Sequence, residues 1–325
     1  MIEVRHLTKY FGETPAVNDI SFSVGRGEVL GFLGPNAAGK STTMRMITGF
    51  LSPTSGTAVI GGSDIVKDSL TARRKIGYLP ENAPAYPDMT VGGFLAFIAG
   101  IRGLRGDRKR ARVAEILGRC FLSDVRHQTI NTLSKGYKQR VCFAQSLLHN
   151  PEYLIMDEPT DGLDPNQKHE VRAMIRDMAR DKTIILSTHI LEEVEQVCTR
   201  AVIIARGRIV ADDTPEGLRE RSDLHGAMRL TVTGPRGNDL VEWLGNLPRI
   251  GRTEILSESG SELTVRLFPG KGEALGERGA DEVLRGLMER GESVQAFFME
   301  KGRLDEVFRT VTRPDAEAGF TQPGL

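Results

Sequence analysis

The 325-residue sequence predicts an α/β protein in which a large domain with a mostly parallel sheet precedes a smaller α+β domain. Three observations support this fold class. Over residues 1–220, short apolar runs alternate with amphipathic segments, as strands do with the helices that cover them. A glycine-rich loop at residues 34–41 stands between a strand-like run and a helix-like run. From residue 228 apolar and polar residues alternate singly, which is typical of strands with one buried face.

Length, charge and cysteine content limit the classes of protein to which this chain can belong. A chain of this length exceeds one comfortable core, so two domains are expected. Because 43 basic residues balance 43 acidic ones, no overall field favours nucleic acid. The three cysteines, Cys120, Cys142 and Cys198, lack C-x-x-C spacing, which predicts reduced thiols rather than disulfides or a zinc site.

The chain offers no membrane span of its own. The N-terminus lacks the pattern of a secretory signal. One of the longest apolar stretches, residues 94–101, is well short of the ~18 residues that a span needs. We therefore expect the protein to stay inside the cell, where any work at a membrane needs a partner.

The large domain, residues 1–220, contains four predicted buried strands. They are the continuous apolar runs at residues 28–33, 153–156, 183–187 and 201–205. Such runs are typical of parallel strands covered on both faces. Between residues 90 and 148 helical spacing replaces the strand pattern, so we expect a helical subdomain inserted into the sheet domain.

A second domain is expected over residues 227–312, after a charged segment at 219–222. The predicted elements are strand 228–233, helix 238–246, strand 253–258, strand 262–268, helix 280–290, strand 293–298 and helix 303–312. The first six predict a ferredoxin-like split βαβ sandwich. This domain carries no metal, nucleophile or phosphate motif, so regulation or dimer contacts are the expected role, and residues 313–325 are expected to form a flexible tail.

The loop at residues 34–41 matches G-x-x-x-x-G-K-[ST]. The backbone N–H groups of such a loop surround phosphates, while Lys40 neutralises charge and Ser41 offers an oxygen to Mg²⁺. The predicted strand before it and the helix over residues 42–50 supply the context that the motif requires. The candidate nucleotide-binding residues of this segment are Gly34, Asn36, Ala37, Ala38, Gly39, Lys40, Ser41 and Thr42.

A second segment, residues 154–158, is a predicted strand that ends in two carboxylates. Asp157 would stand at its carboxyl end, where open parallel sheets place ligands, and would hold Mg²⁺ through the hydration shell of the ion. Glu158 would polarise a water for attack on a γ-phosphate. The alternative, two carboxylates that cap a turn, is disfavoured by Lys40 upstream.

The segment Leu-Ser-Lys-Gly-Tyr-Lys-Gln-Arg at residues 133–140 completes a series of motifs. With it, the chain resembles the ATP-binding subunits of ABC transporters, whose signature motif this segment matches. The resemblance covers residues 1 to about 218 in the family's order, with Ser134 lying 23 residues before Asp157 and His189 lying 32 after it. It implies a P-loop NTPase domain that binds and hydrolyses ATP with Mg²⁺.

The resemblance implies roles for residues outside the two catalytic segments. Phe11 would stack on adenine, with Tyr10 as the alternative. Asp164 falls in the D-loop, which communicates across a dimer, and His189 falls where the family has a histidine that contacts the γ-phosphate.

The resemblance also implies a second copy of the chain. In the family, the signature helix faces the nucleotide of the opposite subunit, and the dipole at a helix N-terminus attracts phosphate. ATP would lie between the Lys40 loop of one copy and the segment of Ser134, Lys135 and Gly136 of the other.

Three positions depart from the family's pattern. Ala37 stands where glycine is usual, so a positive φ there would impose strain. Glu81 replaces the glutamine that contacts Mg²⁺; its carboxylate can also face Mg²⁺, but it adds negative charge near the γ-phosphate. Lys135 replaces the first of two signature glycines and either points outward or adds a cation near the phosphates.

Glu81, residues 86–91 and the signature segment most resemble ATPases of ABC-2-type exporters, especially the gliding-motility-associated branch. The resemblance implies a peripheral subunit at the cytoplasmic face of the membrane, which drives export through separate membrane-spanning permease subunits. Their coupling helix would dock on a surface that includes Pro84, Tyr86 and Pro87, although an ordinary surface loop explains these residues as well. The basic cluster at residues 102–112 is best explained as a solvated helix face, and attraction to anionic lipid or to a membrane partner is the alternative. Nucleic acid is disfavoured, because the cluster lacks the aromatics of nucleic-acid grooves.

Two alternatives remain open from the sequence. One is a soluble ABC ATPase without a transport role, such as a cluster-assembly scaffold. The other is a nucleotide sensor, suggested by Ala37 and Glu81 but disfavoured by the presence of Glu158 and His189.

Overall fold

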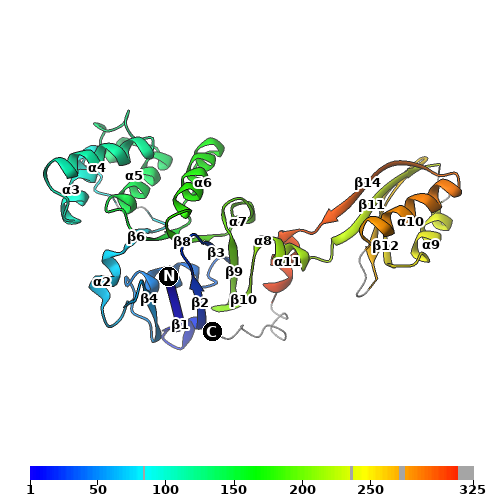
Figure 1. Cartoon of the computed structure of the whole chain (residues 1–325), viewed down its shortest axis with the longest axis horizontal. Helices are drawn as coiled ribbons and strands as arrows, with labels where there is room; N and C mark the ends of the chain where they lie inside the picture. Colours follow the sequence, from blue (N-terminus) through cyan, green and yellow to red (C-terminus); the bar gives the residue numbers. More distant parts are fainter. Residues whose placement is uncertain (83–84, 235–236, 271–274, 314–325) are drawn as a thin grey trace. The chain divides into compact units, whose positions relative to one another are not determined.

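The computed structural model describes residues 1–82, 85–234, 237–270 and 275–313, and it divides into two compact units (Figure 1). The first unit contains Met1–Pro215 together with residues 311–313, and the second contains Glu216–Thr310. The division lies a few residues before the expected boundary near residue 220, because α8 (Pro215–Glu220) falls almost wholly in the second unit. Pro84 and the tail beyond residue 313 lie outside the described residues.

A six-stranded sheet forms the centre of the first unit, with the order β10-β9-β3-β8-β7-β6. Neighbouring strands are parallel except β9 and β10, which form an antiparallel hairpin. Four strands occupy the predicted places, whereas β6 and β10 were not predicted. The strands are β3 (Val29–Leu33), β6 (Ile76–Leu79), β7 (Tyr153–Asp157), β8 (Thr183–Thr188), β9 (Arg200–Ala205) and β10 (Arg208–Asp213).

Both faces of the parallel strands are buried, which explains their continuous apolar runs. In β7, Leu154 and Met156 pack into one hydrophobic core, while Ile155 between them packs into another. Ile184 and Ile185 of β8 divide between the two cores in the same way. The sheet is therefore held rigidly from both sides, and the carboxyl ends of its strands have defined positions.

A second sheet in this unit is antiparallel, with the order β2-β1-β4-β5, and was not predicted. Its strands are β1 (Ile2–Phe11), β2 (Thr14–Val24), β4 (Ser55–Ile60) and β5 (Ser63–Asp64). The alternation of Ile20, Phe22 and Val24, all buried, with polar neighbours was the available signal.

Helices cover the sheets of the first unit. α1 (Lys40–Ile47) follows the glycine-rich loop, and residues 90–148 contain the expected helices α3 (Val91–Ile101), α4 (Gly106–Arg119) and α5 (Lys135–Leu147). Figure 1 shows α3, α4 and α5 gathered together, away from the blue strands β1 and β2. The remaining helices are α2 (Ser69–Arg74), α6 (Pro165–Ala179) and α7 (Leu191–Val197). In the described part of the chain, none of the helices combines the length and apolarity of a membrane span.

The second unit has the ferredoxin-like topology that its sequence predicts. The elements run β11 (His225–Thr233), α9 (Gly237–Gly245), β12 (Ile250–Ser259), β13 (Glu262–Pro269), α10 (Gly276–Glu289) and β14 (Ser293–Lys301), followed by α11 (Leu304–Val311). The sheet is antiparallel with the order β12-β13-β11-β14. Leu230 and Val265 of the sheet pack with Leu244 of α9 and Leu287 of α10, so these helices cover one face.

Candidate active site

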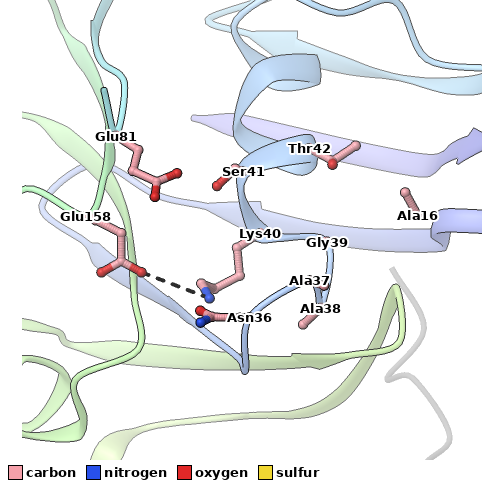
Figure 2. A pocket seen from close by; sticks show the side chains of 10 residues that line it. All are labelled: Ala16, Asn36, Ala37, Ala38, Gly39, Lys40, Ser41, Thr42, Glu81 and Glu158. Atoms are coloured by element: carbon pink, nitrogen blue, oxygen red, sulfur yellow. Dashed lines mark ion pairs between the residues drawn. The ribbon is translucent and has the colours of Figure 1, made fainter. Parts of the chain in front are cut away.

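The glycine-rich loop borders a cavity of about 420 Å³ in the first unit (Figure 2). Glu81 and Glu158 face the loop across it. Nine of the lining residues were singled out from the sequence, and Ala16 is the one that was not. The lining residues are Ala16, Asn36, Ala37, Ala38, Gly39, Lys40, Ser41, Thr42, Glu81 and Glu158.

Close packing of backbone against backbone explains two glycines of the loop. Gly39 has φ 108°, and a Cβ built on it would lie 2.5 Å from the carbonyl oxygen of Ala16. A Cβ on Gly34 would lie 2.5 Å from the carbonyl oxygen of Ile204. Since both obstacles are backbone atoms, no side-chain movement could make room, and the loop requires glycine at these positions.

Ala37 has φ 62°, in the left-handed region. The sequence predicted strain at this position if its φ were positive, and the structure has that conformation. A residue with a Cβ costs about 1–2 kcal/mol there, whereas glycine adopts it freely. The loop therefore holds a modest amount of backbone strain beside the cavity.

Lys40 is buried and points along the loop. Its Nζ donates a hydrogen bond of 2.7 Å to the carbonyl oxygen of Gly34 and lies 4.0 Å from Oε1 of Glu158, the ion pair drawn in Figure 2. Burial lowers the pKa of the Lys40 ammonium, and the negative charges of Glu158, Asp157 and Glu81 oppose that shift. The ammonium is thus a desolvated cation that a polyanion can reach.

Asp157 is the last residue of β7, at the carboxyl end of the parallel sheet. Its Oδ1 accepts a hydrogen bond from Oγ of Ser187 on β8, whereas its buried Oδ2 has no hydrogen-bond partner. A buried carboxylate oxygen without a partner is costly, because it has lost its water and gained nothing in return. Such an oxygen fits a position that would face a cation.

Glu158 follows directly and turns its carboxylate into the cavity. Its φ is 51°, and its N–H lies 3.2 Å from both the carbonyl oxygen and Oγ of Ser187. Oε2 lies 2.9 Å from Nδ1 of His189. Burial raises the pKa of the Glu158 carboxyl, while His189 and Lys40 act to lower it. The site therefore holds a partly desolvated carboxylate next to an imidazole.

His189 lies beside the cavity rather than in its lining. The resemblance predicts that it contacts the γ-phosphate, and in this structure its Nδ1 lies 2.9 Å from Oε2 of Glu158. The histidine and the carboxylate thus form one unit, joined across the ends of β7 and β8.

The signature segment begins α5. Ser134 is its N-cap, with the hydroxyl accepting from the N–H of Tyr137 at 3.4 Å, and Gly136 lies in the first turn. Lys135 forms an ion pair of 2.7 Å with Asp161 on the loop after Glu158. None of the three residues lines the cavity described above.

Two further predicted residues lie away from the cavity lining. Phe11, at the end of β1, is exposed, and Nζ of Lys9 lies 5.5 Å from its ring centroid. Asp164 is the N-cap of α6, where its carboxylate accepts from the N–H of Gln167 at 2.9 Å. Asp164 therefore has a structural contact within its own chain that the sequence reasoning did not assign.

Ser187 was also missed. It is completely buried and contacts both Asp157 and Glu158. The sequence could have indicated Ser187, because it places a hydroxyl at the end of a predicted buried strand, where apolar side chains are usual.

Known proteins are similar to this chain in sequence. Residues 17–161 match the model of the ABC transporter family. The linearmycin resistance ATP-binding protein LnrL of Bacillus subtilis (strain 168) is 37% identical over 235 residues, which are 72% of this chain and 76% of LnrL. The chain belongs to the ABC transporter family of ATP-binding proteins.

Other relatives of this ABC protein differ in length. The Nod factor export ATP-binding protein I of Paraburkholderia xenovorans (strain LB400) is 37% identical over 259 residues, 79% of this chain and 84% of that protein. The probable multidrug ABC transporter ATP-binding protein YbhF of Escherichia coli (strain K12) is 38% identical over 223 residues, 68% of this chain. The chain spans only 38% of the length of YbhF.

Solved structures agree with the family. An ATP-binding subunit of an ABC transporter aligns with TM-score 0.63 and 32% identity over 68% of this chain and 92% of its own. The dimeric cassette MJ0796 in a post-hydrolysis state, bound to ADP and Pi, aligns with TM-score 0.62 and 25% identity. These matches identify the P-loop fold and the ATPase class of the ABC domain.

Proposed function

We propose that this chain is the ATP-hydrolysing subunit of an ABC-2-type exporter. It would act as a peripheral protein at the cytoplasmic face of the membrane and drive transport through separate membrane-spanning permease subunits. The loop cavity, in which Nζ of Lys40 lies 4.0 Å from Oε1 of Glu158, is the observation that carries the ATP-hydrolysing part of the proposal. Relatives named for multidrug transport, linearmycin resistance and Nod factor export favour an exporter over a soluble ATPase.

The finer assignment to the gliding-motility-associated branch rests on the signature segment, Glu81 and residues 86–91. It stays a prediction.

Phosphate binding follows from the loop. The first N–H groups of α1 have no partners within the helix and point toward the loop that precedes it, so they attract anions. Lys40 adds a charge whose desolvation has already occurred on folding. Together they would hold the β- and γ-phosphates of ATP in the cavity.

Mg²⁺ would be held by Ser41, Asp157 and Glu81. The unpartnered buried oxygen of Asp157 supports this assignment, since it leaves a carboxylate free for a cation. Ser41 and Glu81 line the cavity, and hydroxyl and carboxylate oxygens suit Mg²⁺. When bound, the ion would neutralise the negative charge that the phosphates develop during transfer.

Hydrolysis would use Glu158 as the general base. A water oxygen attacks the γ-phosphorus, Glu158 takes a proton from that water, and the bond to the bridging oxygen breaks to release ADP and phosphate. Burial raises the pKa of Glu158, which brings it closer to the pH at which a base works best. The imidazole of His189, 2.9 Å from Oε2, would hold the carboxylate in place.

A second copy of the chain would complete the site. Ser134, Lys135 and Gly136 open α5, a helix of 13 residues whose N-terminus suits phosphate. They do not line the cavity of their own chain, and in the proposed dimer they would face the nucleotide of the opposite copy. Asp164 would lie near this contact, and Phe11 would stack on adenine.

The substitution Glu158→Gln tests the catalytic part of the proposal. Glutamine keeps the shape of the side chain but cannot accept the proton, so we expect steady-state hydrolysis to fall at least about a hundredfold. ATP binding should persist, and an ATP-bound dimer should accumulate in size-exclusion chromatography. Turnover at the wild-type rate would remove Glu158 from the mechanism.

Co-purification tests the transport part. We expect the tagged chain to be recovered from detergent-solubilised membranes together with a multi-span protein. Recovery only in a complex free of any membrane-spanning protein would favour the cluster-assembly alternative.

A further inference from the structure

A buried polar cluster links the two segments that carry Glu158 and His189. Its members are at most 7% exposed, and none of them lines the cavity. The sequence patterns pointed to none of them. The cluster consists of Thr160, Arg172, Thr188 and Glu193.

Glu193 of α7 is the centre of this cluster because its two oxygens serve two different loops. Oε1 accepts a hydrogen bond from Oγ1 of Thr160, and Oε2 accepts one of 2.8 Å from Oγ1 of Thr188. Thr160 lies two residues after Glu158, and Thr188 directly precedes His189. One carboxylate therefore ties together the backbone segments of both groups.

Charge compensation explains how a carboxylate can lie in this place. Nη2 of Arg172, on α6, lies 3.8 Å from Oε1 of Glu193. A buried charge without a nearby opposite charge and without donors would be strongly unfavourable. Two hydroxyl donors and one guanidinium meet that requirement, so the position is built for a carboxylate.

The backbone of Glu158 needs such support. Its φ of 51° is unfavourable for a residue with a side chain, and such conformations persist only where the surroundings hold them. On one side, Ser187 accepts from the N–H of Glu158. On the other side, the carbonyl oxygen of Glu158 accepts from the N–H of Asp161 at 3.1 Å and from Nε2 of Gln139 at 3.5 Å. Thr160, which lies within that turn, is held by Glu193.

We propose that Glu193 is a positioning residue for ATP hydrolysis, which sets the placement of Glu158 against His189 without touching the nucleotide. The inference rests on the proposed role of Glu158 as general base. It predicts that loss of Glu193 lowers the rate of the chemical step and leaves nucleotide binding intact, because the phosphate loop lies on other elements.

The substitution Glu193→Gln in the full chain is the test, with Glu192→Gln as its matched control. Glu192 is the neighbouring carboxylate on α7, and its Oε1 accepts from Arg172 at 3.1 Å and from Gln196 at 2.9 Å rather than from Thr160 or Thr188. We expect Glu193→Gln to lower kcat by about tenfold to a hundredfold, the effect of a small misplacement of a reacting group. The Kd for ATP should stay within about twofold, and Glu192→Gln should change neither by more than about twofold.

A double variant separates positioning from general loss of stability. If Glu193 acts through the histidine and carboxylate pair, Glu193→Gln should add less than about threefold to the loss in kcat caused by His189→Ala. If the double variant instead loses kcat by the product of the two single-variant factors, the inference is wrong. A fall in ATP affinity that matches the fall in kcat would also overturn it.

Variants of Thr160 provide a second test if Glu193→Gln does not fold. Thr160→Val removes the hydroxyl that donates to Glu193, whereas Thr160→Ser keeps it. Lower kcat in the valine variant with recovery in the serine variant supports the inference, and equal kcat in both overturns it.

Glu158→Gln, assayed beside these variants, shows whether the role proposed for Glu158 or only the role proposed for Glu193 is wrong. If Glu158→Gln retains wild-type turnover, the proposed role of Glu158 is wrong. If Glu158→Gln loses turnover while Glu193→Gln keeps it, only the positioning role is wrong.

Discussion

Replacement of Ala37 by glycine tests whether the phosphate loop holds backbone strain. At φ 62° a Cβ costs about 1–2 kcal/mol, and glycine removes that cost. Glycine also gives the unfolded chain more freedom, which costs about 0.4–1 kcal/mol. At the middle of both ranges, the difference leaves Ala37→Gly with a free energy of unfolding about 0.5–1 kcal/mol higher than that of the wild type.

The next residue supplies a matched control. Ala38 is the same residue type in the same loop, but it is buried in the core and has no positive φ. Ala38→Gly loses packing and gains unfolded-state entropy without relieving strain. We therefore expect it to be less stable than the wild type by about 0.5–1 kcal/mol.

Calorimetry measures both effects. For a domain of about 200 residues, 1 kcal/mol corresponds to a change in Tm of about 2–4 °C. We expect Ala37→Gly to raise Tm by about 1–3 °C and Ala38→Gly to lower it by a similar amount. A fall in Tm for both variants would refute the reasoning, because it would mean that the loop gains nothing from a glycine at position 37.

Three further predictions address the site. Gly39→Ala places a Cβ 2.5 Å from the carbonyl oxygen of Ala16 at a φ of 108°, so the Kd for ATP should rise at least about tenfold, measured by equilibrium titration. Burial raises the pKa of the Glu158 carboxyl above its ordinary 4.5, and a general base must be ionised to accept a proton. As the pH is lowered, kcat should therefore begin to fall at a pH above 4.5. A pH profile in which kcat falls only at or below pH 4.5 would contradict the effect of burial. Lys135→Gln breaks the ion pair with Asp161, in which the lysine side chain is 70% exposed. The Tm at low salt should therefore fall by less than about 2 °C, and in 1 M salt the Tm of the variant should match that of the wild type. A lower Tm that persists in 1 M salt would indicate that Lys135 stabilises the fold by contacts other than charge.

Much of the fold follows from local patterns. Continuous apolar runs located β3, β7, β8 and β9, and single alternation located the strands of the ferredoxin-like unit. The antiparallel sheet of β1, β2, β4 and β5 was missed. β1 pairs with β2 across register shifts after Val4, Leu7 and Lys9, which interrupt the period-2 pattern of β1. Only the short alternation in β2 was therefore available as a signal.

The phosphate loop is the part of the site that the sequence describes best. Its strand, turn and helix are contiguous, so the residues that line the cavity are named by one motif. Ala16 escaped because it reaches the loop from β2, a strand without any motif. Asp164 was identified as a dimer-contact residue, yet its cap of α6 is a local contact that its place before Pro165 could have indicated.

The sequence by itself determined that this chain has a phosphate loop, paired carboxylates at a strand end and a helix that begins with a signature segment. These features depend on neighbours in the chain, and local geometry follows from local residues. Only the tertiary structure decided what holds the carboxylates. The parallel pairing of β7 with β8 puts Asp157 opposite Ser187, and α7 then brings Glu193 to Thr160 and Thr188. The contacts of Asp157 with Ser187 and of Thr160 with Glu193 join residues 30 and 33 positions apart, so they depend on strand register and helix packing, which no single segment encodes.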